Sequence, residues 1–194
     1  MKVALIPCAP SEWRAQGRLL GRVELAPVPE AGQRCAQWVE QLRPAMLTRI
    51  FHAPDELSRT AAERVGRGLG IPIRLVEELA EVDVGLWAGL TEEDLEVRFA
   101  KAHRQLADSP LNVSPPEGEA FAAAVVRLRS CLKRRIKPNG KAPLGLVTRP
   151  LALAMARYIL TAGSGPGSIW ETSQRADEPE VLEVSGVPEP PAGG

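Results

Sequence analysis

Short apolar runs alternate with helical segments along the whole chain, and this alternation constrains the fold more than any other feature. Runs typical of strands occupy four segments: residues 3–6, 48–51, 71–76 and 144–148. Apolar residues at helical spacing mark five further segments: residues 30–43, 55–69, 91–106, 121–136 and 151–160. A weaker last strand is predicted at residues 181–184. Because strands separated by helices form parallel sheets covered on both faces, we predict an α/β protein, a three-layer α/β/α sandwich with a mostly parallel central sheet.

The length of 194 residues suits a single domain with one sizeable core. We place this domain at residues 1–184. Residues 185–194 are rich in proline and glycine, a composition that is typical of flexible chain termini. We therefore predict that residues 185–194 form a flexible C-terminal tail.

The charge balance and the cysteines limit the classes of partner. Acidic and basic residues number 24 each and form no basic block, so we expect no nucleic acid and no membrane surface as a partner. The first apolar run is too short for a signal peptide or a membrane span. Cys8, Cys35 and Cys131 lie far apart without metal-ligand spacing. We expect a reduced, cytoplasmic protein that holds no metal and no cofactor.

The loops after the predicted strands are the places to look for a site. In open α/β sheets, ligands bind beyond the carboxyl ends of the strands. In this chain the loops after the four main strands begin at Pro7, His52, Glu77 and Arg149. These loops are therefore expected to meet at one edge of the sheet.

Five segments, in the same order along the chain, resemble the histidine phosphatase (phosphoglycerate-mutase-like) superfamily. The opening segment carries Glu12, Trp13, Gly17 and Arg18 after the first predicted strand. The others are residues 27–32, a Glu-x-Asp-x-Gly-x-Trp-x-Gly-Leu-Thr motif at 81–91, a Pro-x-Gly-Glu turn within 115–119, and a strand with its turn at 146–150. The resemblance spans about residues 1–184 and implies a phosphoglycerate-mutase-like fold.

The resemblance also implies a phosphate site, in which a histidine attacks phosphorus, two arginines and a second histidine hold the phosphate, and a carboxyl group protonates the leaving oxygen. The matching positions in this chain hold, in chain order, Pro7, Cys8, Leu57, Glu81 and Arg149. Pro7 and Leu57 replace the arginines, while Cys8 and Arg149 replace the histidines. Only Glu81 keeps the family's residue type. Because catalytic groups that act as a unit fail as a unit, the resemblance implies a member without the family's chemistry.

We therefore interpret the chain as a non-catalytic member with a binding, structural or regulatory role. His52 and His103, the only two histidines, match neither replaced position. Arg59 lies two positions after Leu57 and restores one arginine if the register shifts locally. The expected partner is an unidentified small anion or a protein. The helix at residues 151–160 is apolar on nearly every face, which is typical of a core helix or of a homodimer contact.

A first alternative is a phosphatase that acts on a small phosphomonoester with Cys8 as its nucleophile. Cys8 and Arg14 have the Cys-x5-Arg spacing of cysteine-dependent phosphatases, in which loop amides and the arginine hold the phosphate. The loop between them argues against this role. Pro10 has no amide hydrogen, Glu12 repels an anion, and the loop contains no glycine. The simpler interpretation is a small buried thiol at the end of a strand.

A second alternative is an anion sensor that uses Arg149 together with Arg14. Arg149 follows the fourth strand, where the resemblance places a phosphate-binding histidine. The competing interpretation is that Arg149 pairs internally with Glu81 or Glu12, because opposite charges in a partly buried site find each other. We favour the internal pair.

Overall fold

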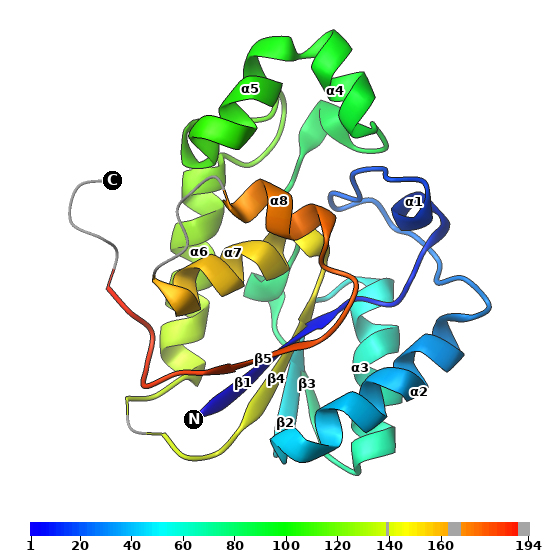
Figure 1. Ribbon diagram of the computed structural model, residues 1–194, viewed down its shortest axis with the longest axis vertical. Coiled ribbons are helices and arrows are strands. Elements are labelled where there is room, and N and C mark those ends of the chain that lie inside the picture. The colour runs from blue at the N-terminus through cyan, green and yellow to red at the C-terminus, as the bar shows by residue number, and fades with distance from the viewer. Residues whose placement is uncertain (139, 163–167, 190–194) are drawn as a thin grey trace.

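A five-stranded sheet forms the centre of the computed structural model, which describes residues 1–138, 140–162 and 168–189 (Figure 1). The strands are β1 (Lys2–Pro7), β2 (Arg49–His52), β3 (Ile73–Leu75), β4 (Leu144–Thr148) and β5 (Glu180–Glu183), in the order β3-β2-β4-β1-β5. The first four run parallel to their neighbours, and β5 pairs antiparallel with β1. This arrangement confirms the predicted mostly parallel sheet, although β3 is shorter than the predicted segment 71–76.

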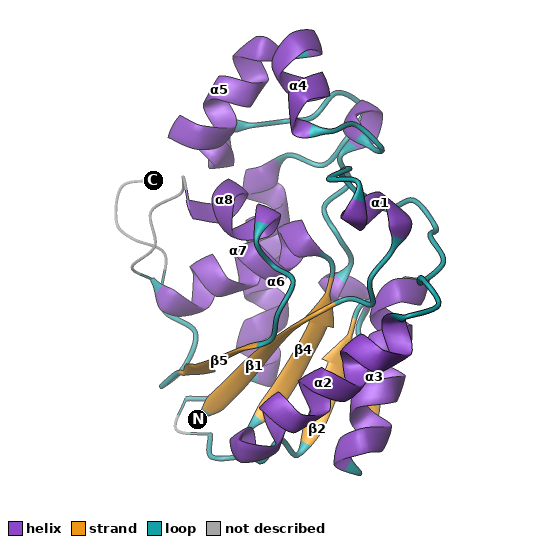
Figure 2. Ribbon diagram, turned by 45° about the vertical axis from the view of Figure 1, so that its right-hand side comes forward, coloured by secondary structure: helices purple, strands orange, loops and turns teal. Residues whose placement is uncertain are grey.

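Helices cover both faces of this sheet (Figures 1 and 2). One face carries α2 (Ala31–Leu42) and α3 (Glu56–Leu69), and the other carries α6 (Phe121–Arg135) and α7 (Pro150–Thr161), with α8 (Ser168–Gln174) against α7. Side chains alternate along β1: Val3 and Leu5 join the cluster on the α6–α7 side, while Ala4 and Ile6 join the cluster on the α2–α3 side. The predicted three-layer α/β/α sandwich is therefore confirmed.

The ends of the helices follow from local signals in the sequence. The N-cap of α3 is Asp55, whose carboxylate accepts from the Ser58 amide, and Gly70 closes the helix with a φ of 68°. Pro150 opens α7 at a position where a missing amide hydrogen costs little. Asp55 and α7 both contribute to the site described below.

The segment predicted as one helix over residues 91–106 is instead two helices, α4 (Glu92–Arg98) and α5 (Ala100–Asp108). The start is as predicted, because Thr91 and Asp94 form a reciprocal capping box. The break falls at Phe99, whose φ of −136° is not helical. Its ring packs 5.9 Å from the Trp87 ring. Packing of this aromatic pair therefore overrides a helical pattern that continues through the segment.

Several short elements have no counterpart in the sequence-based prediction. They are α1 (Glu12–Ala15), α8, and the 3-10 turns η1 (Arg43–Ala45), η2 (Glu77–Leu79), η3 (Gly85–Trp87) and η4 (Pro110–Asn112). Each spans too few residues to show a clear period.

Two motifs that carry the resemblance, at residues 81–91 and 115–119, lie directly against each other. The Leu86 amide donates to the Pro116 carbonyl, and the Glu119 amide donates to the Asp83 carbonyl. Gly85 has a φ of 50°, and a Cβ there would lie 2.1 Å from the Pro116 carbonyl oxygen. A side chain at this glycine is therefore excluded by both backbone conformation and space. The retained motif serves the scaffold.

The C-terminal part of the described chain returns to α6. Lys133 on α6 pairs with Glu189 at 2.7 Å, and Arg129 donates to the Pro188 carbonyl. The rest of the predicted tail, residues 190–194, lies outside the described residues. The apolar helix α7 is buried between α6, α8 and β1, so it belongs to the core of this chain. A homodimer stays a prediction. Within the described ranges, no helix has the length and apolar character needed to cross a membrane.

Candidate functional site

The carboxyl ends of β1 and β4 bring the replaced family positions together. The Cys8 amide donates to the Thr148 carbonyl at 3.1 Å, and the Ala9 amide donates to the Leu57 carbonyl at 3.0 Å. Arg149 follows Thr148 directly. The loops that were expected to meet at this edge of the sheet therefore do meet, and the chemistry there depends on what each side chain contacts.

Arg149 is completely buried, and its guanidinium is held by groups of this chain. Its Nε lies 2.8 Å from the Asp55 carboxylate, and its Nη1 donates to the carbonyls of Gly21 and Val23 at 2.7 and 2.8 Å. Its Nη2 has no hydrogen-bond partner among the described residues. A buried guanidinium without a counter-charge is very costly, and Asp55 supplies that charge.

The internal pair of Arg149 is present, but the predicted partner carboxylate is wrong. Asp55 caps α3 immediately after β2, which is the neighbour of β4, so it lies beside Arg149. Glu12 lies on the exposed helix α1 and accepts from the Gln16 side chain. Glu81 is bound elsewhere. The pairing of β2 with β4 therefore determines that Asp55 is the partner of Arg149.

Glu81 caps the first turn of α7. Its carboxylate accepts from the amides of Val82, Leu151 and Ala152 at 2.8, 3.0 and 2.7 Å. Burial raises the pKa of Glu81 to about 7, against the opposing effect of the three amides. Sequence reasoning missed this structural role. The available signal was Pro150, which begins a helix whose next amides need acceptors.

A cavity of about 420 Å³ opens beside Cys8. Its lining includes Cys8, Arg14, Arg34, Trp38 and Asp177. Burial, followed by the nearby Asp55 carboxylate, raises the pKa of the Cys8 thiol far above its usual range. The thiolate is the nucleophilic form of cysteine, so this environment is unfavourable for attack on phosphorus.

The loop that follows Cys8 does not cradle an anion. The amides of Cys8 and Ala9 already bond to backbone carbonyls, Pro10 has no amide hydrogen, and the Arg14 amide bonds to the Ser11 hydroxyl. A phosphate cradle needs several loop amides that point to a common centre. The Cys-x5-Arg spacing is therefore present, but the loop lacks the converging amides that bind phosphate in cysteine-dependent phosphatases.

Both arginines that line the Cys8 cavity hold carboxylates from the segment between α8 and β5. The Arg14 Nε lies 2.8 Å from the Asp177 carboxylate, and its Nη2 donates to the Gln174 carbonyl. Arg34 pairs with Glu178, which also accepts from the Trp38 indole at 3.2 Å. Sequence reasoning missed these two acids. They precede the last strand, whereas the search covered the loops that follow strands, and they carry no motif.

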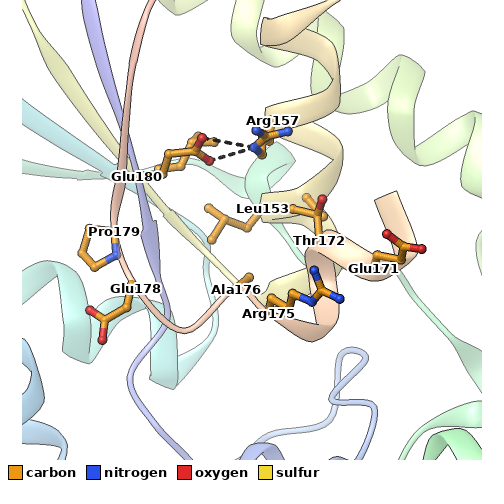
Figure 3. Close-up of a pocket in the computed structure, with 11 residues that line it drawn as sticks. Leu153, Arg157, Glu171, Thr172, Arg175, Ala176, Glu178, Pro179 and Glu180 are labelled. Atoms are coloured by element: carbon orange, nitrogen blue, oxygen red, sulfur yellow. Dashed lines mark hydrogen bonds and ion pairs between the residues drawn. The ribbon is translucent and has the colours of Figure 1, made fainter. Parts of the chain in front are cut away.

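The same segment separates the Cys8 cavity from a second one. This second cavity, of about 390 Å³, lies between α7, α8 and the chain that leads into β5 (Figure 3). Ala176 lines both cavities. Figure 3 shows Arg157 directed toward Glu180, to which it pairs at 2.9 Å. The Arg157 charge at this wall is thus also balanced within the chain.

Of the remaining sequence candidates, Pro7 also lines the Cys8 cavity, and the others lie outside it. Leu57 is fully buried among apolar side chains on the α2–α3 side. Arg59 is exposed and pairs with Glu56, so a register shift does not restore the family arginine. His52 is buried with its Nδ1 2.8 Å from the Ala53 carbonyl, and His103 lies 3.2 Å from Glu92. Across the described residues, no group of three or more metal-ligating side chains forms a metal site.

The chain is similar in sequence to proteins that are named as phosphatases and mutases. It is 22% identical over 171 residues to phosphoserine phosphatase 1 of Hydrogenobacter thermophilus, covering 88% of this chain and 80% of that protein. It is 26% identical over 154 residues to a Citrobacter koseri protein named "Probable phosphoglycerate mutase GpmB", covering 79% and 71%.

A solved structure shows that the fold is also similar to that of a phosphatase. A mycobacterial glucosyl-3-phosphoglycerate phosphatase in complex with VO3 superimposes with a TM-score of 0.76 at 16% identity, covering 87% of this chain and 84% of that one. The model of the histidine phosphatase superfamily (branch 1) matches residues 8–184. With this match over most of its length, and with the sheet order and loop cluster described above, the chain belongs to the histidine phosphatase superfamily.

Proposed function

We propose that this chain is a non-catalytic histidine phosphatase-like protein with a binding, structural or regulatory role. The observation that carries the proposal is the network of Arg149 with Asp55, Gly21 and Val23. It occupies the position where the resemblance implies a phosphate-binding histidine. Asp55 already balances its charge, so a substrate phosphate would compete with a buried ion pair for this guanidinium.

The position of the nucleophile supports the same proposal. Cys8 has a strongly raised pKa, and the amides around it are already bonded. Leu57 has an apolar side chain at the position where the resemblance implies an arginine that holds a phosphate oxygen. Glu81, the one retained residue, caps α7, and backbone amides occupy its carboxylate.

The three thiols support a reducing, cytoplasmic location for this protein. Cys8, Cys35 and Cys131 are all free and buried in the described structure. Structural disulfides are typical of secreted proteins, and none joins these three residues.

The decisive experiment measures hydrolysis of p-nitrophenyl phosphate, phosphoserine and 3-phosphoglycerate by the purified chain. The matched control is Cys8→Ser, which removes the thiol and keeps the size of the side chain. We expect both proteins to show the same rate as buffer. Turnover of any substrate by the wild type that disappears in Cys8→Ser would replace the proposal with the cysteine-phosphatase alternative.

The anion-sensor alternative has a separate test. The protein used is the double variant Arg49→Gln/Lys141→Gln. Arg14 and Arg149 are both paired with carboxylates, so inorganic phosphate is expected to leave the unfolding temperature of this variant unchanged. This background removes two exposed cations that lie at the other end of the sheet. A rise in unfolding temperature there, lost on Arg14→Gln, would favour an anion sensor at the Cys8 cavity.

A further inference from the structure

A cavity of about 210 Å³ lies at the amino ends of β2 and β4, which is the edge of the sheet opposite to Cys8. Its lining consists of Met1, Arg49, Phe51, Arg135, Lys137, Gly140, Lys141, Ala142 and Leu144. Four of these residues are cationic, and among the described residues none that lines the cavity is acidic. This concentration of positive charge stands out in a chain whose formal net charge is zero.

The four cations come from separate parts of the chain. Arg49 is the first residue of β2, Arg135 is the last residue of α6, Lys137 follows it, and Lys141 precedes β4. The register of the sheet pairs Arg49 with Leu144, which explains why the start of β2 and the approach to β4 meet. The N-terminus of the chain lies at the same end of the sheet (Figure 1).

Three of the four cations are available to a ligand. The side chains of Arg49, Lys137 and Lys141 are exposed, and none forms a hydrogen bond or ion pair with a residue in the described ranges. Arg135 is held in place instead. Its guanidinium lies 5.6 Å over the Phe51 ring, its Nη1 donates to the Cys131 carbonyl, and its Nη2 lies 3.6 Å from Glu78.

Basic residues at the end of a helix have an ordinary explanation, since they offset the negative end of the helix dipole. That explanation covers Arg134 and Arg135, which also interact with Glu78. It does not cover Arg49 or Lys141, which belong to other segments. Three of the four cations have no counter-charge among the described residues, and like charges around one concave site attract anions to it.

We propose that this cavity binds a small anion carrying two or more negative charges, of the phosphate or diphosphate class. The Arg49 guanidinium suits a bidentate contact with phosphate oxygens, and the ammonium groups of Lys137 and Lys141 supply two further point charges. Arg135 adds a fixed charge behind them. The site is independent of the proposed function, because it uses none of the residues at the Cys8 edge.

The test is isothermal titration calorimetry with inorganic diphosphate, and with inorganic phosphate, at constant ionic strength. Arg49→Gln/Lys141→Gln removes two of the free cations. The matched control is Lys101→Gln/Arg104→Gln, which removes two exposed charges on α5 and leaves the cavity intact. We expect measurable diphosphate binding by the wild type and by the control, weakened at least about tenfold in Arg49→Gln/Lys141→Gln.

Each other result overturns the proposal. Absence of binding by the wild type would remove the site. Equal weakening in both double variants would show attraction to the surface in general. Weakening in Arg14→Gln would move the ligand to the Cys8 cavity. A thermal melt without ligand checks folding of every variant, and the two double variants are expected to melt near the wild type because their substituted side chains are exposed.

Discussion

The two ends of the central sheet treat positive charge in opposite ways. At the carboxyl end, Arg149 pairs with Asp55 and Arg14 pairs with Asp177. At the amino end, Arg49 and Lys141 have no partner in the part of the chain that the structure describes. The cause is burial, because a buried guanidinium requires a counter-charge while a solvated one does not. The end where the family resemblance places a phosphate site is therefore already neutralised, and the opposite end is the one that can accept an anion.

The largest expected effect comes from breaking the buried pair at the carboxyl end. Arg149→Met leaves the Asp55 carboxylate without its counter-charge and two carbonyls without a donor. We expect the free energy of unfolding to fall by about 3–5 kcal/mol. Urea denaturation measures this change. Arg59→Gln is the control, because it removes an exposed arginine and is expected to cause no measurable loss.

A double-mutant cycle sharpens this prediction. Asp55→Asn keeps an N-cap residue for α3 but removes the charge that Arg149 contacts. The double variant Asp55→Asn/Arg149→Met is expected to lose less stability than the sum of the two single variants, by about 1 kcal/mol or more. Additive losses would mean that the two residues are not energetically coupled.

The next effect is a pH dependence that belongs to Glu81. Burial raises the pKa of this carboxyl from 4.5 to about 7, so the folded state keeps a proton that the unfolded state releases. The resulting stability is fully present below pH 4.5 and is lost as the pH rises toward 7, at no more than about 1.4 kcal/mol per pH unit. Urea midpoints at a series of pH values measure this slope. Glu81→Gln should flatten it between pH 5 and 7, and an unchanged slope would assign the dependence to other groups.

A smaller effect follows from making the carboxyl end resemble the amino end. Asp177→Asn/Glu178→Gln leaves Arg14 and Arg34 without carboxylates beside the Cys8 cavity. These pairs are partly exposed, so we expect a loss of less than about 1 kcal/mol in the free energy of unfolding. We also expect weak phosphate binding to appear, measured by calorimetry in an Arg49→Gln/Lys141→Gln background. Adding Arg14→Gln should abolish it, and binding that survives this change would contradict the assignment.

The smallest expected effect is at the amino end. In the absence of any anion, Arg49→Gln/Lys141→Gln should change the free energy of unfolding by about 0.5 kcal/mol or less, because exposed unpaired cations contribute little. Any change is expected to be stabilising, since repulsion among the four cations is reduced. A thermal melt at low and high salt measures it. A clear loss of stability would reveal an internal partner for one of these side chains.

Much of the architecture was predictable because its determinants are local. Apolar periodicity located the four parallel strands and most of the helices. The helix expected to begin at residue 91 does begin there, where Thr91 and Asp94 form a capping box. The same reasoning gave a wrong prediction at Phe99, where the expected single helix is divided into α4 and α5. Its side chain fits a helical pattern locally, but its packing on Trp87 requires a different backbone. A local sequence pattern cannot predict a contact that forms only in the tertiary structure.

The sequence by itself determined which residue types stand at the family's phosphate-handling positions, and it determined the layers of the fold through its hydrophobic pattern. Only the tertiary structure decided what those residues contact. Arg149 meets Asp55, 94 residues away, because β2 and β4 are neighbours. Glu81 accepts from the Ala152 amide of α7, 71 residues away. The interaction between two charges depends on their distance in space, and the pairing of the strands sets that distance.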